Sequence, residues 1–195
     1  MAGMAFRPDA FLYTALLVFL ILLFIPKGRR FIRSLGFRHQ DNWLKTIAIA
    51  AAGYAAVLGA QTIAAAILPE IFNPDDPGYY ADLVGNTALY VFSLISGVVI
   101  GGFVEEMIFR GFLLTRLIKI YGKSNRAILS IVAVTSLAFG LMHISQSLGS
   151  AIATGIFSLI ASLIFVKTRC NLWLIILMHS VNNIVTFTVL YLGLA

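Results

Sequence analysis

Charged side chains are scarce in this sequence of 195 residues, of which aspartate, glutamate, lysine and arginine together make up 11%. A soluble domain usually carries about 25% of these residues. Hydrophobic residues make up 60% of the chain, and the mean hydropathy is +0.95. This composition excludes an ordinary water-soluble domain and predicts an integral membrane protein whose helices face lipid.

Cysteine is almost absent, and the single thiol of Cys170 excludes an intramolecular disulfide. No Asn-x-Ser/Thr sequon for N-glycosylation occurs. The first apolar run precedes its positive charges and lacks a small-x-small cleavage site, which is not typical of a signal peptide. The small size and the absence of sequons favour a bacterial or archaeal cell membrane.

Positive charge exceeds negative charge, giving a net charge of +6. The basic residues form short clusters between apolar runs, which is typical of cytoplasmic loops of membrane proteins, and no nucleic-acid partner is expected. The clusters are Lys27, Arg29, Arg30, Arg33, Arg38 and Lys45; Lys119, Lys123 and Arg126; and Lys167 and Arg169. We expect these three loops to be cytoplasmic, and the acidic segment 69–82, the segment 145–150 and both termini to lie outside.

Apolar runs that approach the length of a bilayer set the predicted architecture. A spanning helix needs about 20 residues, at about 1.5 Å each. Six runs come close to this length, and they predict one all-α, polytopic transmembrane helix bundle over residues 1–195. The expected spans are 11–25, 46–68, 83–118, 127–144, 151–166 and 172–194.

The third of these runs is too long for a simple crossing. Residues 83–118 would form an ideal helix about 54 Å long, whereas the hydrocarbon core is about 30 Å thick. Either Gly101 and Gly102 kink this helix, or the helix protrudes from the bilayer. The pattern leaves both possibilities open.

Polar side chains that are costly to bury in lipid occur on three of the predicted spans. A charged group at membrane depth costs about 2.5–3.5 kcal/mol on insertion scales, so it needs an interior position with partners or water. Measured along each helix, Glu105, His143, His179 and Asn183 lie about 15–25 Å from the nearest basic loop residue. Three helices thus bring polar groups to similar depths, which predicts one shared polar cavity.

Spacing within each helix supports this interpretation. His179 and Asn183 are four residues apart and share a helix face. Glu106 and Arg110 are also four apart, with the acid first, which is the favoured orientation for an ion pair. Glu105 points about 100° away from Glu106, so one carboxylate can pair with Arg110 while the other faces a different neighbour.

Three short motifs resemble those of a known family. The stretches "EEMIFR" (105–110), "FGLMH" (139–143) and "HSVNN" (179–183) resemble the E-E-x-x-x-R, F-x-x-x-H and H-x-x-x-N/B motifs of the CPBP family. This family comprises CAAX-prenyl endopeptidases and bacteriocin-processing intramembrane proteases. The motifs occur in order on separate spans, and the resemblance covers roughly residues 80–190.

The resemblance implies an intramembrane endopeptidase with these residues in defined roles. Glu105 would be the general base that activates water, helped by His143, while His179 and Asn183 would stabilise the oxyanion of the scissile carbonyl. Glu106 and Arg110 would hold the site in shape. The reaction would be direct hydrolysis, without a cofactor, of a membrane-associated peptide or a lipidated protein.

Other functions stay open at this point. Two histidines and two glutamates could bind zinc, although no His-Glu-x-x-His motif occurs. A non-catalytic transporter or bacteriocin-immunity protein would also place Glu, Arg and His within the membrane, but six spans without evident inverted repeats make a poor carrier. A serine or cysteine protease is less favoured, because no Ser/His/Asp trio stands out and Cys170 lies at the cytoplasmic end of a predicted span.

Overall fold

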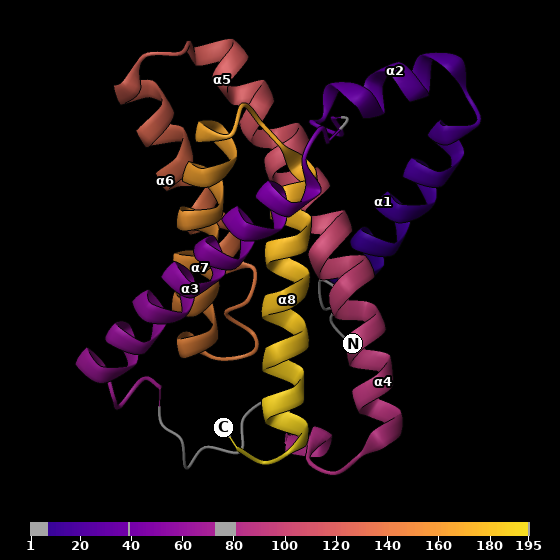
Figure 1. Cartoon of the computed structure of the whole chain (residues 1–195). Coiled ribbons are helices and arrows are strands. Elements are labelled where there is room, and N and C mark those ends of the chain that lie inside the picture. Colours follow the sequence, from indigo (N-terminus) through magenta and orange to yellow (C-terminus); the bar gives the residue numbers. More distant parts are fainter. Residues whose placement is uncertain (1–7, 39, 73–80, 195) are drawn as a thin grey trace, which may run out of the picture.

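The structure is a computed structural model that describes residues 8–38, 40–72 and 81–194. Within these ranges it is built from helices, as Figure 1 shows, and the predicted all-α fold is confirmed. The elements are α1 (Pro8–Leu23), α2 (Pro26–Ser34), α3 (Trp43–Ile67), η1 (Ala81–Leu83), a long helix formed by α4 (Thr87–Ser96), η2 (Gly97–Glu105), η3 (Met107–Leu114) and α5 (Thr115–Tyr121), then α6 (Asn125–Leu141), α7 (Leu148–Lys167) and α8 (Leu172–Tyr191).

Four helices are long and apolar enough to cross a membrane, so the chain is an integral, multi-pass membrane protein. These are Trp43–Ile67, Thr87–Tyr121, Leu148–Lys167 and Leu172–Tyr191. Helices α1 and α6 are also apolar, but they have only 16 and 17 residues, at or below the lower end of a spanning range of about 17–25. Of the six predicted spans, four therefore correspond to long helices and two to short ones.

Polar side chains fix where five of the helices begin. An N-cap side chain accepts a hydrogen bond from a backbone N–H that the first helical turn leaves unpaired. The residues in this role are Asn42, Asn86, Ser124, Ser147 and Asn171. The predicted spans begin at the first residue of each apolar run. The capping residues place several helix starts a few residues away from these positions. Helix α3 begins at Trp43 rather than at 46, and the long helix begins at Thr87 rather than at 83.

The basic connection after α1 contains a helix that the pattern of apolar runs does not predict. Pro26 begins α2, where its missing N–H costs nothing and its fixed φ angle suits the first turn. Gly28 and Ile32 are buried, whereas the cationic side chains of this helix are exposed. A Cβ atom at Gly28 would lie 2.3 Å from the Leu22 carbonyl oxygen, so the turn from α1 to α2 requires glycine.

The middle of the long helix differs from an ideal α-helix. The whole helix runs without a break over 35 residues, from Thr87 to Tyr121. Its middle is wound as a π-helix over the 9 residues of η2 and the 8 residues of η3. Because i→i+5 bonding places more residues in each turn, this section is wider and shorter than an α-helix of the same length. π-helical segments are rare and frequently mark functional sites.

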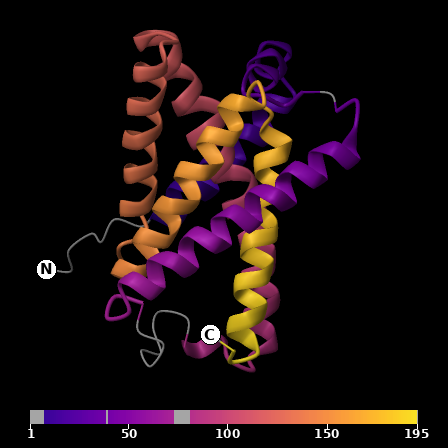
Figure 2. The same ribbon diagram turned by 60° about the vertical axis from the view of Figure 1, so that its left-hand side comes forward.

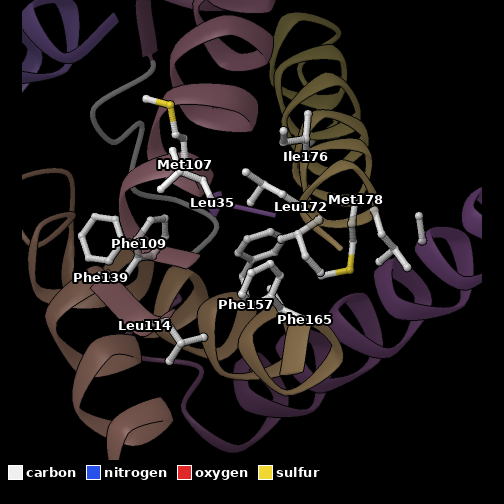
Figure 3. Packing of buried hydrophobic residues seen from close by; sticks show 14 of the residues in the cluster. Leu35, Met107, Phe109, Leu114, Phe139, Phe157, Phe165, Leu172, Ile176 and Met178 are labelled. Atoms are coloured by element: carbon white, nitrogen blue, oxygen red, sulfur yellow. The ribbon is translucent and has the colours of Figure 1, made fainter. Parts of the chain in front are cut away.

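Helix α8 lies at the centre of the bundle. It packs against η2, α3, α4 and α7, and α3 crosses this group at a steep tilt, as Figure 2 shows. Large apolar side chains pack between the helices and form a core, part of which is drawn in Figure 3. Among them Leu114, Phe165 and Leu172 are 0% exposed, so they are tightly packed.

Close contact between α6 and α7 depends on glycine, which leads to a stability prediction. A Cβ atom at Gly140 would lie 2.6 Å from the Ala151 carbonyl oxygen and 3.1 Å from the Gly155 Cα atom. Both are backbone atoms that cannot turn away, so we expect Gly140→Ala to lower the free energy of unfolding by about 1–3 kcal/mol.

The control is Gly155→Ala on the facing helix, where a Cβ atom would meet its nearest neighbours at 3.9 Å. Thermal unfolding in detergent compares the two variants. Equal stability of Gly140→Ala and Gly155→Ala would contradict the close approach at Gly140.

Candidate active site

Glycines on the π-helical segment bring its acidic residues against α8. A Cβ atom at Gly97 would lie 2.6 Å from the Phe187 ring, and one at Gly102 would lie 2.3 Å from the Ser180 Oγ atom. Small residues at such positions let two helices approach closely within a membrane. The approach places Glu105 and Glu106, which follow directly, beside His179 of α8.

Glu106 is the centre of a buried polar network. Its Oε1 atom accepts a hydrogen bond of 2.8 Å from Arg110 Nη1 and one of 2.7 Å from His179 Nδ1. Glu106 and Arg110 are 0% and 1% exposed. The ion pair predicted from the i,i+4 spacing is present, and it also fixes His179. Since a carboxylate only accepts hydrogen bonds, Nδ1 of His179 carries a proton and its Nε2 atom is left for another partner.

Two aromatic rings enclose the Arg110 guanidinium. Its central carbon lies 4.7 Å from the centroid of the Phe139 ring and 5.7 Å from that of Phe157. The Nε and Nη2 atoms of Arg110 make no hydrogen bond to the described part of the chain. The negative faces of the two rings attract the guanidinium and so partly stabilise its buried charge. Figure 3 shows Phe109 packed against Phe139, which holds this ring in place.

His143 lies in the turn that follows α6, with its ring fixed on one side. Its Nδ1 atom is 2.9 Å from the Phe139 carbonyl oxygen. A carbonyl oxygen can only accept, so Nδ1 is the protonated nitrogen and Nε2 carries a lone pair. The Phe139 ring packs against the imidazole at a centroid distance of 5.0 Å.

Glu105 differs from its neighbour Glu106 in its surroundings. It is 9% exposed, and its carboxylate makes no hydrogen bond to any residue that the structure describes. It lies on the wall of a cavity of about 1120 Å³, whereas Glu106 and Arg110 lie behind that wall. The two adjacent carboxylates therefore differ in their contacts: Glu106 is held by Arg110 and His179, and Glu105 borders the cavity.

Asn183 contributes an amide that is already partly engaged. Its Nδ2 atom donates to the Gly97 carbonyl oxygen at 2.8 Å, and its Oδ1 atom accepts from Asn182 at 3.4 Å. A Cβ atom at Gly101 would lie 2.5 Å from Asn183 Nδ2 and 3.6 Å from His179 Nε2, so these two polar atoms converge on Gly101. One N–H of the amide is left for a ligand.

The structure brings together four residues that three separate sequence segments contribute. Glu105, His143, His179 and Asn183 line the same cavity, as the matched helix depths predict. Gln61 and Asn182 also line the cavity. Each is an uncharged polar residue within an apolar helix, which is the sequence feature that distinguishes it.

A substitution at Gly101 should affect the site more than the fold. We expect Gly101→Ala to displace the Asn183 side chain, since the new Cβ would collide with Nδ2, while the flexible amide absorbs the shift. Any activity supported by Asn183 should fall about 10-fold to 100-fold, given about 2.7–4 kcal/mol for complete loss of an oxyanion donor and only partial displacement here.

The control for this variant is Gly59→Ala on α3, where a Cβ atom would meet nothing within 4 Å. Activity of both variants is compared after matching for folded protein by size-exclusion chromatography. Unchanged activity of Gly101→Ala would show that activity does not depend on the position of the Asn183 amide.

The described residues contain no group of three or more His, Cys, Asp or Glu side chains placed to hold a metal ion together. A Zn²⁺ site of the catalytic kind takes three protein ligands. The zinc hypothesis therefore needs a direct test by chelation experiments.

Comparison with protein families gives a match over the candidate site. The family described as "Type II CAAX prenyl endopeptidase Rce1-like" matches residues 87–185, which is half of the chain and holds all three motifs. No curated protein and no solved structure gives a significant match.

Proposed function

Because the chain belongs to the Rce1-like family of type II CAAX prenyl endopeptidases, we propose that it is an intramembrane endopeptidase. Its substrate would be a membrane-associated or prenylated protein, and the reaction would be hydrolysis of a peptide bond by water that Glu105 activates. The observation that carries this proposal is that Glu105, His143, His179 and Asn183 line one cavity.

In the proposed reaction, Glu105 takes a proton from a water molecule in the cavity, assisted by the lone pair on His143 Nε2. The hydroxide oxygen then forms a bond to the carbonyl carbon of the scissile peptide. When the tetrahedral intermediate collapses, the carbon–nitrogen bond breaks, and the departing amine takes the proton that Glu105 holds. The protein is left unmodified, with no covalent acyl intermediate.

In this scheme, two residues of α8 stabilise the oxyanion. The Nε2 atom of His179, when it carries a proton, donates to the developing negative charge, while Glu106 holds the ring in place through Nδ1. The second N–H of Asn183 Nδ2 is a further donor near the same point. Arg110 acts indirectly, because it holds the carboxylate of Glu106 in place.

The proposal includes an arrangement in the membrane. We place all six apolar helices across the bilayer as one domain, with the short α1 and α6 completing the crossings. The three connections that carry the basic clusters would lie in the cytoplasm.

The activity is tested with a library of membrane-anchored reporter peptides, which the purified protein should cleave in detergent micelles. Mass spectrometry identifies the products.

The same assay separates water activation by Glu105 from the zinc alternative. We expect activity to stay within twofold after dialysis against a chelator, because the scheme uses no metal. Loss of cleavage on chelation with recovery on adding Zn²⁺ would overturn this mechanism, and no cleavage of any reporter would argue against the function itself.

A further inference from the structure

Helix α2 carries positive charge that no nearby acid neutralises. No aspartate or glutamate occurs from residue 10 to residue 40 of the sequence. Ion pairs among the described residues involve Glu106, and none involves α2. The exposed cations of α2 are Lys27, Arg29, Arg30 and Arg33. An uncompensated cluster of this kind attracts anions.

The arginines of α2 share one side of the helix. At about 100° per residue, Arg29, Arg30 and Arg33 fall within an arc of about 100°. Gly28 and Ile32 lie on another side and are buried, and Ile32 belongs to the apolar core. Packing of this buried side therefore fixes α2 with its arginines facing outward.

The position of α2 suits the boundary between lipid and water. Figure 1 shows α2 at one end of the bundle, lying at a large angle to α8, which is long and apolar enough to cross the membrane. A helix at such an angle runs along the membrane surface rather than through it. Phe24 and Ile25, directly before α2, are 86% and 43% exposed, and apolar side chains beside a basic helix are typical of burial among acyl chains.

The cationic surface continues onto α5. The central carbon of the Arg116 guanidinium lies 5.9 Å from the ring centroid of Phe31 in α2 and 5.7 Å from that of Phe112. The two rings hold this cation beside α2 by cation–π attraction, which leaves its N–H groups free to donate. A planar guanidinium with free donors can bind a phosphate through two hydrogen bonds.

We propose that α2 lies along the membrane interface and that its cationic face, together with Arg116, binds the headgroup phosphates of anionic phospholipids. Basic clusters next to a membrane helix are typical of such binding. A soluble acidic partner would leave Phe24 and Ile25 in water, whereas a phospholipid supplies both the anion and the apolar chains. This binding would not depend on the proposed protease activity.

Binding of short-chain lipids to the purified protein in a neutral detergent tests the site. Dihexanoyl phosphatidylglycerol has an anionic headgroup, and dihexanoyl phosphatidylcholine has the same chains and no net charge. We expect the dissociation constant of the phosphatidylglycerol to be at least about 10-fold lower, because each cation near an anionic surface contributes about fivefold in affinity. Equal affinity for the two lipids, measured by native mass spectrometry, would overturn the proposal.

Two triple variants with the same loss of charge locate the site. Combining Arg29→Gln, Arg30→Gln and Arg33→Gln should raise the dissociation constant of dihexanoyl phosphatidylglycerol at least about 10-fold. The control removes three exposed cations outside α2, and it should change this constant by less than about twofold. Its substitutions are Lys123→Gln, Arg126→Gln and Lys167→Gln. Equal weakening in both variants would show a general effect of net charge and would overturn a site on α2.

The contribution of α5 is tested by Arg116→Gln, which should weaken binding of the same lipid about fivefold. Unchanged affinity would remove Arg116 from the site.

Glycerophosphoglycerol, which is the same headgroup without acyl chains, distinguishes a lipid site from a site for soluble anions. It should bind at least about 10-fold more weakly than the lipid, because Phe24 and Ile25 then have no acyl chain to contact. Binding as tight as that of the lipid would overturn the placement of α2 at the membrane interface.

Discussion

Replacing Glu105 by glutamine should reduce kcat for peptide hydrolysis by about 10²–10⁴-fold, the range that a positioned general base contributes. Glutamine keeps the shape of the side chain but cannot accept the proton of the attacking water. Glu105 makes no hydrogen bond to the described part of the chain, so the substitution leaves the network of Glu106, Arg110 and His179 in place. The melting temperature should therefore stay close to that of the wild type.

The matched control for this experiment is Glu70→Gln, at an exposed acid outside the cavity. It should keep full activity and full stability. Retention of more than half of the wild-type rate by Glu105→Gln would remove Glu105 from its role as base.

Removing the positive charge of Arg110 should have the largest effect on stability. Arg110→Met keeps much of the side-chain volume but leaves the Glu106 carboxylate, which is 0% exposed, without its cation. Loss of one partner of a buried ion pair costs about 3–5 kcal/mol, because an uncompensated charge stays buried. We expect a loss of this size in unfolding experiments in detergent, and a matching loss of activity because His179 depends on the same carboxylate.

A double variant separates the ion pair from side-chain packing. Glu106→Gln combined with Arg110→Met removes both charges, so it should be less destabilised than the sum of the two single variants by about 0.5–3 kcal/mol. Lys119→Met, at an exposed position on the same long helix, controls for loss of a cation and should change stability by less than about 0.5 kcal/mol. Strict additivity of the two single effects would contradict a direct Glu106–Arg110 interaction.

Much of the helical architecture could be predicted from hydrophobicity alone. Because lipid forces backbone groups to pair within helices, long apolar runs become helices regardless of detailed sequence. Leu172 begins α8 as predicted, whereas other helix starts were less accurate. The capping residues Asn42 and Ser147, for example, lie four residues before the predicted starts at 46 and 151. Helix α2 was missed because its sequence is basic and short, and its helical form depends on Pro26 and on packing of Ile32.

The grouping of the candidate site residues could also be predicted, because the helix rise gives depth directly from residue number. The i,i+4 spacing also predicts that Arg110 pairs with Glu106 rather than with Glu105, and the structure contains this ion pair. The hydrogen bond from His179 to the same carboxylate could not be predicted, because it depends on how α8 packs against the long helix. The π-helical winding of Gly97–Glu105 and Met107–Leu114 was not predicted from the sequence either.

The central claim is that a water molecule activated by Glu105 attacks the peptide bond directly, and isotope labelling tests it most directly. The purified protein, in excess over a cleavable reporter peptide, completes a single turnover in H₂¹⁸O. Mass spectrometry then measures heavy oxygen in the new C-terminal carboxylate and in the proteolytic fragment that contains Glu105. The account predicts one ¹⁸O atom in the product and none in the Glu105 fragment. A product without heavy oxygen, or ¹⁸O in the Glu105 fragment from a covalent intermediate, would contradict it.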